Sequence, residues 1–212
     1  MWGRWYVVMA EVSIKVDAAE LKKIYDGLKE HEEVARKAII SAVNRTIQST
    51  NTELQRHITK IYNLKRQDLS GGSKYKGDSS NNLVKVKKAT TNNFSASIEV
   101  RGGFITLYRF VQGNNQPTNK KGTRVRVKVK KGKAIKMSNV NFINYPRGNK
   151  GNLQIFQRHK SGRDISRLLK TTSVAHMASN EKVIEPTQKK ANETLQKRAE
   201  HELQYRLSKI KG

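Results

Sequence analysis

Two histidine–glutamate pairs, at positions 31–32 and 201–202, have the residue types of a zinc-dependent hydrolase. Such a site needs a second histidine four residues after the first, so that both ligands share one face of a helix. Those positions hold Ala35 and Tyr205. The five histidines show no other ligand spacing, and the chain has no cysteine. We therefore expect no metal site, no disulfide and no thiolate chemistry.

Carboxylates are the next residues that could support catalysis. Between Val100 and Arg163 there is no Asp or Glu to act as a general base or to bind Mg²⁺. Glu99 and Asp164 flank this stretch, and a nuclease site would require them to converge. The chain has no nucleophile elbow, no P-loop and no dinucleotide fingerprint. We expect a protein that is not an enzyme and that uses no cofactor.

The same acid-free stretch is strongly basic. It contains sixteen Lys and Arg, nine of them between Lys120 and Lys136, in a chain of 43 basic and 17 acidic residues with a net charge of +26. A surface of this kind cannot neutralise itself, so its partner should be acidic. The partner classes are nucleic acid, an anionic membrane or an acidic protein.

One segment of the stretch has the pattern of a basic strand. Val125, Val127 and Val129 alternate with Lys and Arg, so an extended backbone would point the valines inward and space the cations by about 7 Å on the opposite face. Such a stripe suits phosphate groups or the carboxylates of a docking subunit equally well. The candidate residues for binding an anionic partner are Arg124, Arg126, Lys128, Lys130, Lys131 and Lys133.

No apolar run reaches the length of about 18–20 residues that a membrane span needs, so we expect no membrane partner. The first ten residues lack the order of a signal peptide. The alternating pattern that follows Met9 makes that residue an alternative to Met1 as the native start. The lack of cysteine fits a reducing cytoplasm.

Apolar periodicity predicts the elements of the N-terminal part. Residues 12–16 alternate as a strand does, and residues 18–30 and 32–61 have helical spacing. Asn63 is predicted to end the second helix in a left-handed turn. Residues 71–82 are rich in Gly, Ser, Asn and Lys and are predicted to form a loop.

Strand patterns dominate the centre of the chain. Residues 84–87 and 94–100 are predicted to pair as an antiparallel hairpin around the turn at 90–93. Residues 104–111 fit either a buried strand or a short helix. A strand over 123–131 should turn back at 131–133, and residues 155–158 form another strand.

The C-terminal segment, 180–210, is predicted to be helical. Pro186 is costly inside a helix, so the main helix is expected to start near Glu185, with Pro186 in its first turn, or to kink there.

This order of elements predicts an α+β fold, with an N-terminal helical pair and a C-terminal helix packed on a mainly antiparallel, strongly basic sheet. We interpret the chain, 1–212, as a single domain. Its segments are a strand and helical pair (9–70), a loop (71–82), a basic β region (83–160) and a C-terminal helical region (161–212).

Several segments together resemble the minor tail protein Z family of bacteriophages and prophages. They are Arg36–Ser49, which contains the run AIISAVNRTIQS, then Ile61–Leu69, which contains YNLK, then Lys87–Thr90 with Ser95–Ile98, the basic strand Thr123–Lys131 and the helix Asn180–Leu207. The resemblance runs in order from about Val12 onward. The departures are the loop at 71–82 and the position of Pro186.

The resemblance implies a non-enzymatic virion component that acts in tail completion or head–tail joining. It also implies a homo-oligomeric ring assembled with other tail or neck proteins, with packaged DNA as a further partner. Such a protein would be located in the tail or neck of the virion, and in the host cytoplasm during assembly. The alternative is a cytoplasmic DNA-binding protein that uses the same basic strand.

Overall fold

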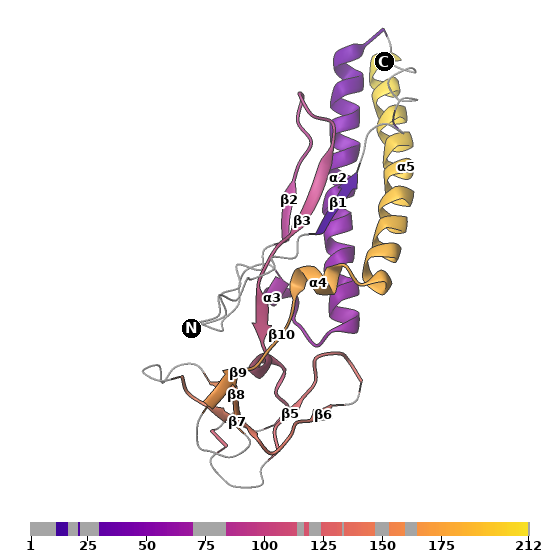
Figure 1. Cartoon of the computed structure of the whole chain (residues 1–212). Helices are drawn as coiled ribbons and strands as arrows, with labels where there is room; N and C mark the ends of the chain where they lie inside the picture. Colours follow the sequence, from indigo (N-terminus) through magenta and orange to yellow (C-terminus); the bar gives the residue numbers. More distant parts are fainter. Residues whose placement is uncertain are drawn as a thin grey trace. The chain divides into compact units, whose positions relative to one another are not determined.

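The computed structural model describes residues 12–16, 21, 30–69, 84–113, 117–118, 124–132, 134–146, 153–159 and 165–211. It contains both helices and antiparallel strands (Figure 1), which confirms the α+β class. The described residues form two compact units. Unit 1 comprises those within 58–69 and 101–177, and unit 2 comprises those within 12–57, 84–100 and 178–211. The single domain expected from the sequence stays a prediction.

Helix α2 (Glu32–Ile61) has the bounds that its apolar spacing predicts. Glu32 and Glu33 lie in its first turn, where a negative charge interacts favourably with the helix dipole. Each of them also pairs with a cation four residues later. The polar stretch at 48–53 does not end the helix, and Thr50 is accommodated because its hydroxyl donates to the carbonyl of Thr46 at 2.9 Å. The buried members of the predicted stripe are Ile39, Val43, Ile47, Leu54 and Ile58.

Helix α5 (Glu181–Lys211) confirms the helical segment predicted at 180–210, and it does not start near Glu185, the first of the two alternatives for Pro186. The side-chain oxygen of Asn180 accepts a hydrogen bond from the N–H of Lys182 at 3.1 Å. The backbone carbonyl of Asn180 accepts one from the N–H of Val183 at 2.7 Å. This cap fixes the helix start ahead of Pro186. Pro186 then lies in the second turn of α5. Proline has no N–H, so it cannot donate the helical hydrogen bond to the backbone carbonyl of Lys182. Lys182 is an exposed residue.

The two long helices run antiparallel and side by side in unit 2 (Figure 1). A buried carboxylate joins them: Glu202 of α5 accepts a hydrogen bond from Ser41 at 3.0 Å and pairs with Arg45 at 2.9 Å, both on α2. Arg206 lies 3.8 Å from the other oxygen of the same carboxylate. The side chain of Glu202 is only 3% exposed, so its charge is compensated by these contacts rather than by water.

A three-stranded antiparallel sheet completes unit 2. Its order is β1 (Val12–Val16), β3 (Ala96–Val100) and β2 (Val84–Lys87), so the predicted strand and hairpin are confirmed and β3 is central. Ile98 of β3 lies opposite both Ile14 and Val86, and together they build an apolar row. On the other face Glu99 lies opposite Lys85 and pairs with Lys87. Glu99 therefore partly offsets the lysines on this face of the sheet.

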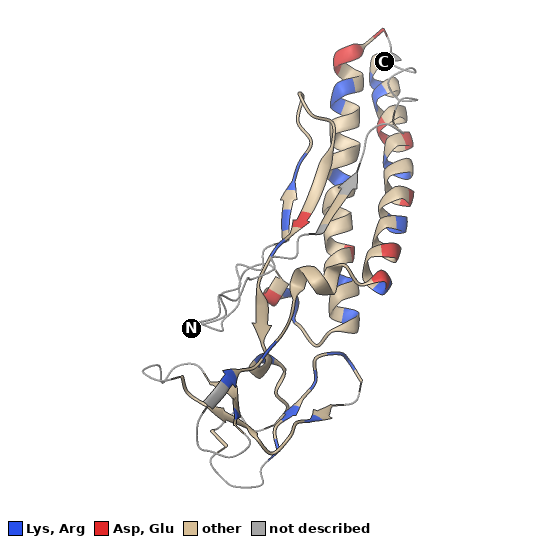
Figure 2. Ribbon diagram, viewed as in Figure 1, with Lys and Arg blue, Asp and Glu red and all other residues tan. Residues whose placement is uncertain are grey.

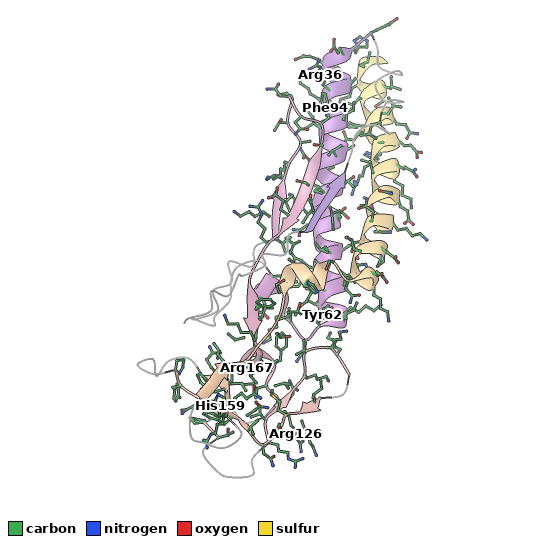
Figure 3. All side chains as sticks on the ribbon, in the orientation of Figure 1. Arg36, Tyr62, Phe94, Arg126, His159 and Arg167 are labelled. Carbon is green, nitrogen blue, oxygen red and sulfur yellow. The ribbon has the colours of Figure 1, made fainter. Side chains whose placement is uncertain are left out.

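Asn44 ties the hairpin to α2. Its side-chain amide donates to the carbonyl of Ala89 at 3.1 Å and accepts the N–H of the same residue at 2.8 Å. At the tip of the hairpin, the guanidinium of Arg36 lies 6.0 Å from the ring centroid of Phe94 (Figure 3). These contacts hold the sheet against the helix.

Unit 1 is built from short strands. Residues 104–111 were predicted to form either a strand or a short helix. They contain both, a strand β4 (Phe104–Thr106) followed by a 3₁₀ turn η2 (Leu107–Phe110). The strand predicted at 155–158 is confirmed as β8 (Gln154–Arg158), the centre of a sheet in which it pairs with β7 (Asn141–Asn144) and β9 (Ile165–Leu168). β10 (Lys170–Ser173) pairs with β4 and leads into the short helix α4 (Val174–Ala178).

An ion pair anchors the core of unit 1. Arg109 of η2 and Asp68 of the short helix α3 (Arg66–Leu69) approach to 2.5 Å, with side chains 3% and 14% exposed. Asp68 also accepts the N–H of Lys65 at 2.8 Å, which closes the turn between α2 and α3. The apolar residues of this core include Ile105, Phe110, Ile143 and Ile155, and four polar residues are buried with them: Thr106, Asn141, Gln154 and Ser173.

Helix α2 ends in a different way from the one predicted. Asn63 does not adopt a left-handed conformation, since none of the described non-glycine residues has a positive φ. Its N–H instead donates to the carbonyl of Val129 at 2.8 Å, so a tertiary contact ends the helix.

The helix predicted at 18–30 and the loop at 71–82 lie outside the described residues, apart from Leu21 and Glu30. The described strands form four small sheets, and the packing of all helices on one basic sheet stays a prediction.

Candidate anion-binding surface

The predicted basic strand is shorter than expected, and it is one half of a hairpin. β5 (Arg126–Val127) pairs antiparallel with β6 (Ile135–Lys136), with Arg126 opposite Lys136 and Val127 opposite Ile135. The predicted turn around Gly132 therefore exists, and Gly132 has a φ of 133°, which favours glycine. We call the exposed cationic face of this hairpin the basic face.

The backbone of the segment 124–131 is held on both sides. On one side Met137 donates to the carbonyl of Val125 at 2.8 Å, next to the β5–β6 pairing. On the other side Gln112 donates to the carbonyl of Arg126 at 2.9 Å, and the N–H of Lys128 donates to the carbonyl of Phe110 at 2.8 Å. The basic face is thus displayed from a rigid backbone, so no ordering of this backbone is needed when a partner binds.

The end of α2 secures the second half of the segment. The N–H of Lys131 donates to the carbonyl of Ile61 at 2.7 Å, and Tyr62 forms an isolated antiparallel bridge with Lys130. Lys60 lies in the last turn of α2. Cations near a helix C-terminus are stabilised by the helix dipole. The positions of Lys130 and Lys131 therefore have a partly structural explanation.

Burial follows the predicted alternation. Val125 and Val127 are 3% and 4% exposed, and Val129 is half-buried. Among the predicted site residues Arg124, Arg126, Lys130 and Lys131 are exposed, Lys128 is half-buried, and Lys133 lies outside the described residues. The side chain of Arg126 extends outward from β5 (Figure 3).

Lys136 belongs to the basic face and was not among the residues selected from the sequence. It is exposed and lies opposite Arg126 in the hairpin register. Because Met137 bonds to Val125 across the ladder, Arg126 and Lys136 form a non-hydrogen-bonded pair, in which side chains approach most closely. The sequence did not give this pairing, because a three-residue turn at 131–133 would set Lys128 opposite Lys136, whereas the register of the hairpin is two residues different.

Two like charges directly opposite each other destabilise a sheet. Within the described part of the chain no carboxylate pairs with Arg126 or Lys136. Arg124, two residues before Arg126 and on the same face, donates its Nε–H to the side-chain oxygen of Asn139 at 2.8 Å. This bond orients the guanidinium of Arg124, which is exposed. The three cations form an arrangement that an oxyanion would stabilise.

The described residues of unit 1 contain little negative charge that could neutralise this face. The described residues of unit 1 contain 14 Lys and Arg and a single acid, Asp68. Asp68 is already engaged with the buried Arg109. The described residues of unit 2 contain 16 basic and 10 acidic residues, many of them in ion pairs along the helices. Figure 2 shows the acidic residues gathered on α2 and α5.

Of the two carboxylates considered for catalysis, the structure describes only Glu99. Glu99 lies on β3 and pairs with Lys87, while Asp164 lies outside the described residues. Among the described residues there is no group of three His, Asp or Glu placed to hold a metal ion. None of their helices is long and apolar enough to cross a membrane.

Comparison with protein-family models, with curated proteins and with solved structures gives no match. What the basic face can do chemically follows from its own geometry. Its described residues present cations on a hydrogen-bonded backbone, suited to carboxylates or phosphates, and include no carboxylate that could act as a general base.

Proposed function

We propose that the chain is a non-enzymatic structural protein of a tailed phage or prophage, a minor tail component acting in tail completion or head–tail joining. In this proposal unit 2 is scaffold, and the basic face of unit 1 docks onto acidic surfaces of neighbouring tail or neck proteins. The observation that carries the proposal is the segregation of charge. The described residues of unit 1 contain one acid and 14 cations, and that acid, Asp68, is paired with the buried Arg109.

The segment that resembles the minor tail protein Z family supports a scaffold role for unit 2. Asn44 binds the backbone of Ala89, Arg45 pairs with Glu202, and the hydroxyl of Thr46 donates to the carbonyl of Ala42 at 2.8 Å. These three polar residues of the segment are therefore engaged in contacts within unit 2. A catalytic role would instead require polar groups that are open to a substrate.

The proposal is tested in the phage or prophage that encodes the chain. Mass spectrometry of purified particles should detect the protein, and its deletion should yield heads and tails that fail to join into infectious particles. The charge reversal Arg126→Glu should reduce incorporation into particles. The matched control Lys189→Glu makes the same charge change at an exposed position of α5 in unit 2, and should leave incorporation unchanged. Infectious tailed particles that form without the protein would overturn the proposal.

The second candidate is a DNA-binding protein, favoured by the alternation of cations along a single extended segment. It predicts that a DNA duplex binds the purified chain without any virion protein, with an affinity that falls steeply as salt rises. Arg126→Glu and Lys128→Glu should each weaken that binding and reduce its salt dependence. Binding to duplex DNA that is unaffected by both changes would exclude this use of the basic face.

A further inference from the structure

The outer edge of β6 carries backbone groups that point away from the hairpin. In the β5–β6 ladder Met137 bonds to Val125 and Ile135 lies opposite Val127, so these residues direct their backbone groups toward β5. Successive residues of a strand alternate in this respect. The N–H and C=O of Lys136 therefore face the outer edge. No hydrogen bond within the described part of the chain engages them.

Ile135 is exposed beside this edge. It has 65% of its surface open to solvent, the largest fraction among the large apolar side chains of the described residues. It lies on the face of the hairpin that contains the buried Val127, whereas Lys136 and Arg126 lie on the basic face. The edge thus combines an apolar side chain on one face with cations on the other.

Sheet edges are usually protected by short strands and by charged side chains. The short strand and Lys136 fit that protective role, but an exposed isoleucine at the same edge opposes it. An apolar side chain left in water next to unpaired backbone groups is the arrangement that a pairing strand would cover.

We propose that an extended, acidic segment of a partner protein adds to the outer edge of β6 as a further strand. The inference rests on the proposed function and names the chemistry of the docking partner. Side chains of the added strand alternate between its two faces. Those on the basic face would be Asp or Glu, close to Lys136 and Arg126, and those on the other face would be apolar and cover Ile135. The partner segment therefore alternates acidic and apolar residues.

A peptide backbone fits this edge better than nucleic acid does. Lys136 offers one N–H donor and one C=O acceptor, and an added strand supplies a partner for both. A phosphate group accepts hydrogen bonds but donates none, so it would leave the carbonyl of Lys136 without a partner. It would also leave Ile135 in water.

The experiment measures binding of a fluorescent peptide with alternating Glu and Val to the full chain by fluorescence anisotropy. A peptide of the same composition, with Glu and Val grouped in two blocks, is the control for charge alone. We expect the alternating peptide to bind about tenfold more tightly, since each paired hydrogen bond and covered apolar group contributes severalfold to an affinity. Equal binding of the two peptides would overturn the inference.

Lys136→Pro and Lys136→Gln separate the backbone from the charge. Both remove the cation, but only proline removes the N–H that faces the edge. Proline is tolerated at an edge position whose N–H points to solvent, so β5–β6 pairing is retained. Lys136→Pro should weaken binding of the alternating peptide about fivefold to tenfold more than Lys136→Gln does. The same loss for both variants would contradict strand addition.

A second measurement leaves the protein unchanged, in case Lys136→Pro fails to fold. A peptide that is N-methylated at alternate amides cannot donate hydrogen bonds to the edge, and should lose the advantage of the alternating sequence. Ile135→Thr keeps a β-branched side chain and should also weaken binding of the alternating peptide, while leaving the block peptide unaffected. If these changes have no effect but Arg126→Gln still weakens both peptides, the docking function stands and the strand addition fails.

Discussion

Replacing Arg126 with glutamate is expected to stabilise unit 1 while it removes binding to acidic partners. In the wild-type chain Arg126 lies opposite Lys136 as a like-charge, non-hydrogen-bonded pair. The substitution turns this pair into one of opposite charge. If Arg126 served only folding, reversing its charge would not raise the stability of unit 1. A gain in stability together with a loss of binding would therefore identify Arg126 as a residue retained for binding.

The magnitude follows from the geometry of the pair. Two unit charges about 5 Å apart interact by about 0.8 kcal/mol in water. Screening with a Debye length of about 8 Å roughly halves this at physiological salt. Because the sign reverses, the total change is about twice the screened value, or about 0.8 kcal/mol, within the range measured for cross-strand pairs. For a chain of this size that raises the melting temperature by about 2–3 °C.

The assay is thermal unfolding followed by circular dichroism, with Arg126→Gln as the control for loss of the arginine side chain. We expect the melting temperatures to rise in the order wild type, Arg126→Gln, Arg126→Glu. At about 1 M salt, where the Debye length falls to about 3 Å, the differences should nearly vanish. If Arg126→Glu melts no higher than Arg126→Gln at low salt, Arg126 and Lys136 do not interact across the hairpin, and the reasoning is refuted.

Three further substitutions test contacts that stabilise each unit internally, and each is measured by urea unfolding. Asp68→Asn leaves the buried guanidinium of Arg109 without its carboxylate and should cost about 3 kcal/mol; a loss below about 1 kcal/mol would show that water reaches this pair. Glu202→Gln removes the charge that joins α5 to Arg45 and should cost about 2 kcal/mol, whereas the exposed control Glu200→Gln should change nothing measurable. Asn44→Ala removes both hydrogen bonds to the hairpin segment and should cost about 2 kcal/mol; an unchanged midpoint would mean that the hairpin is held by its apolar face alone.

The sequence was sufficient for elements whose signal is local. The bounds of α2 follow from apolar spacing over thirty residues, and the β2–β3 hairpin follows from alternation on both sides of an Asn-rich turn. In these segments the hydrophobic pattern and the turn chemistry favour the same structure. The inward valines and outward cations of residues 124–130 could be predicted for the same reason.

Predictions failed where a contact between distant residues decided the backbone. Asn63 was expected to cap α2 by local geometry, but its N–H bonds to Val129, more than sixty residues away. The alternative in which the main helix starts near Glu185 was wrong because it considered Pro186 without the cap that Asn180 supplies. The strand at 123–131 proved short because its neighbours are a 3₁₀ turn and a helix end, which cannot continue a ladder.

The sequence alone determined which residues carry the positive charge and predicted an acidic partner, since composition and alternation need no tertiary information. Only the tertiary structure decided that, among the described residues, no carboxylate pairs with the cations of the basic face. It placed Asp68 against the buried Arg109, and it set Lys136 opposite Arg126. The physical reason is that Coulomb interactions depend on distances in space, which the order of residues along a chain does not fix.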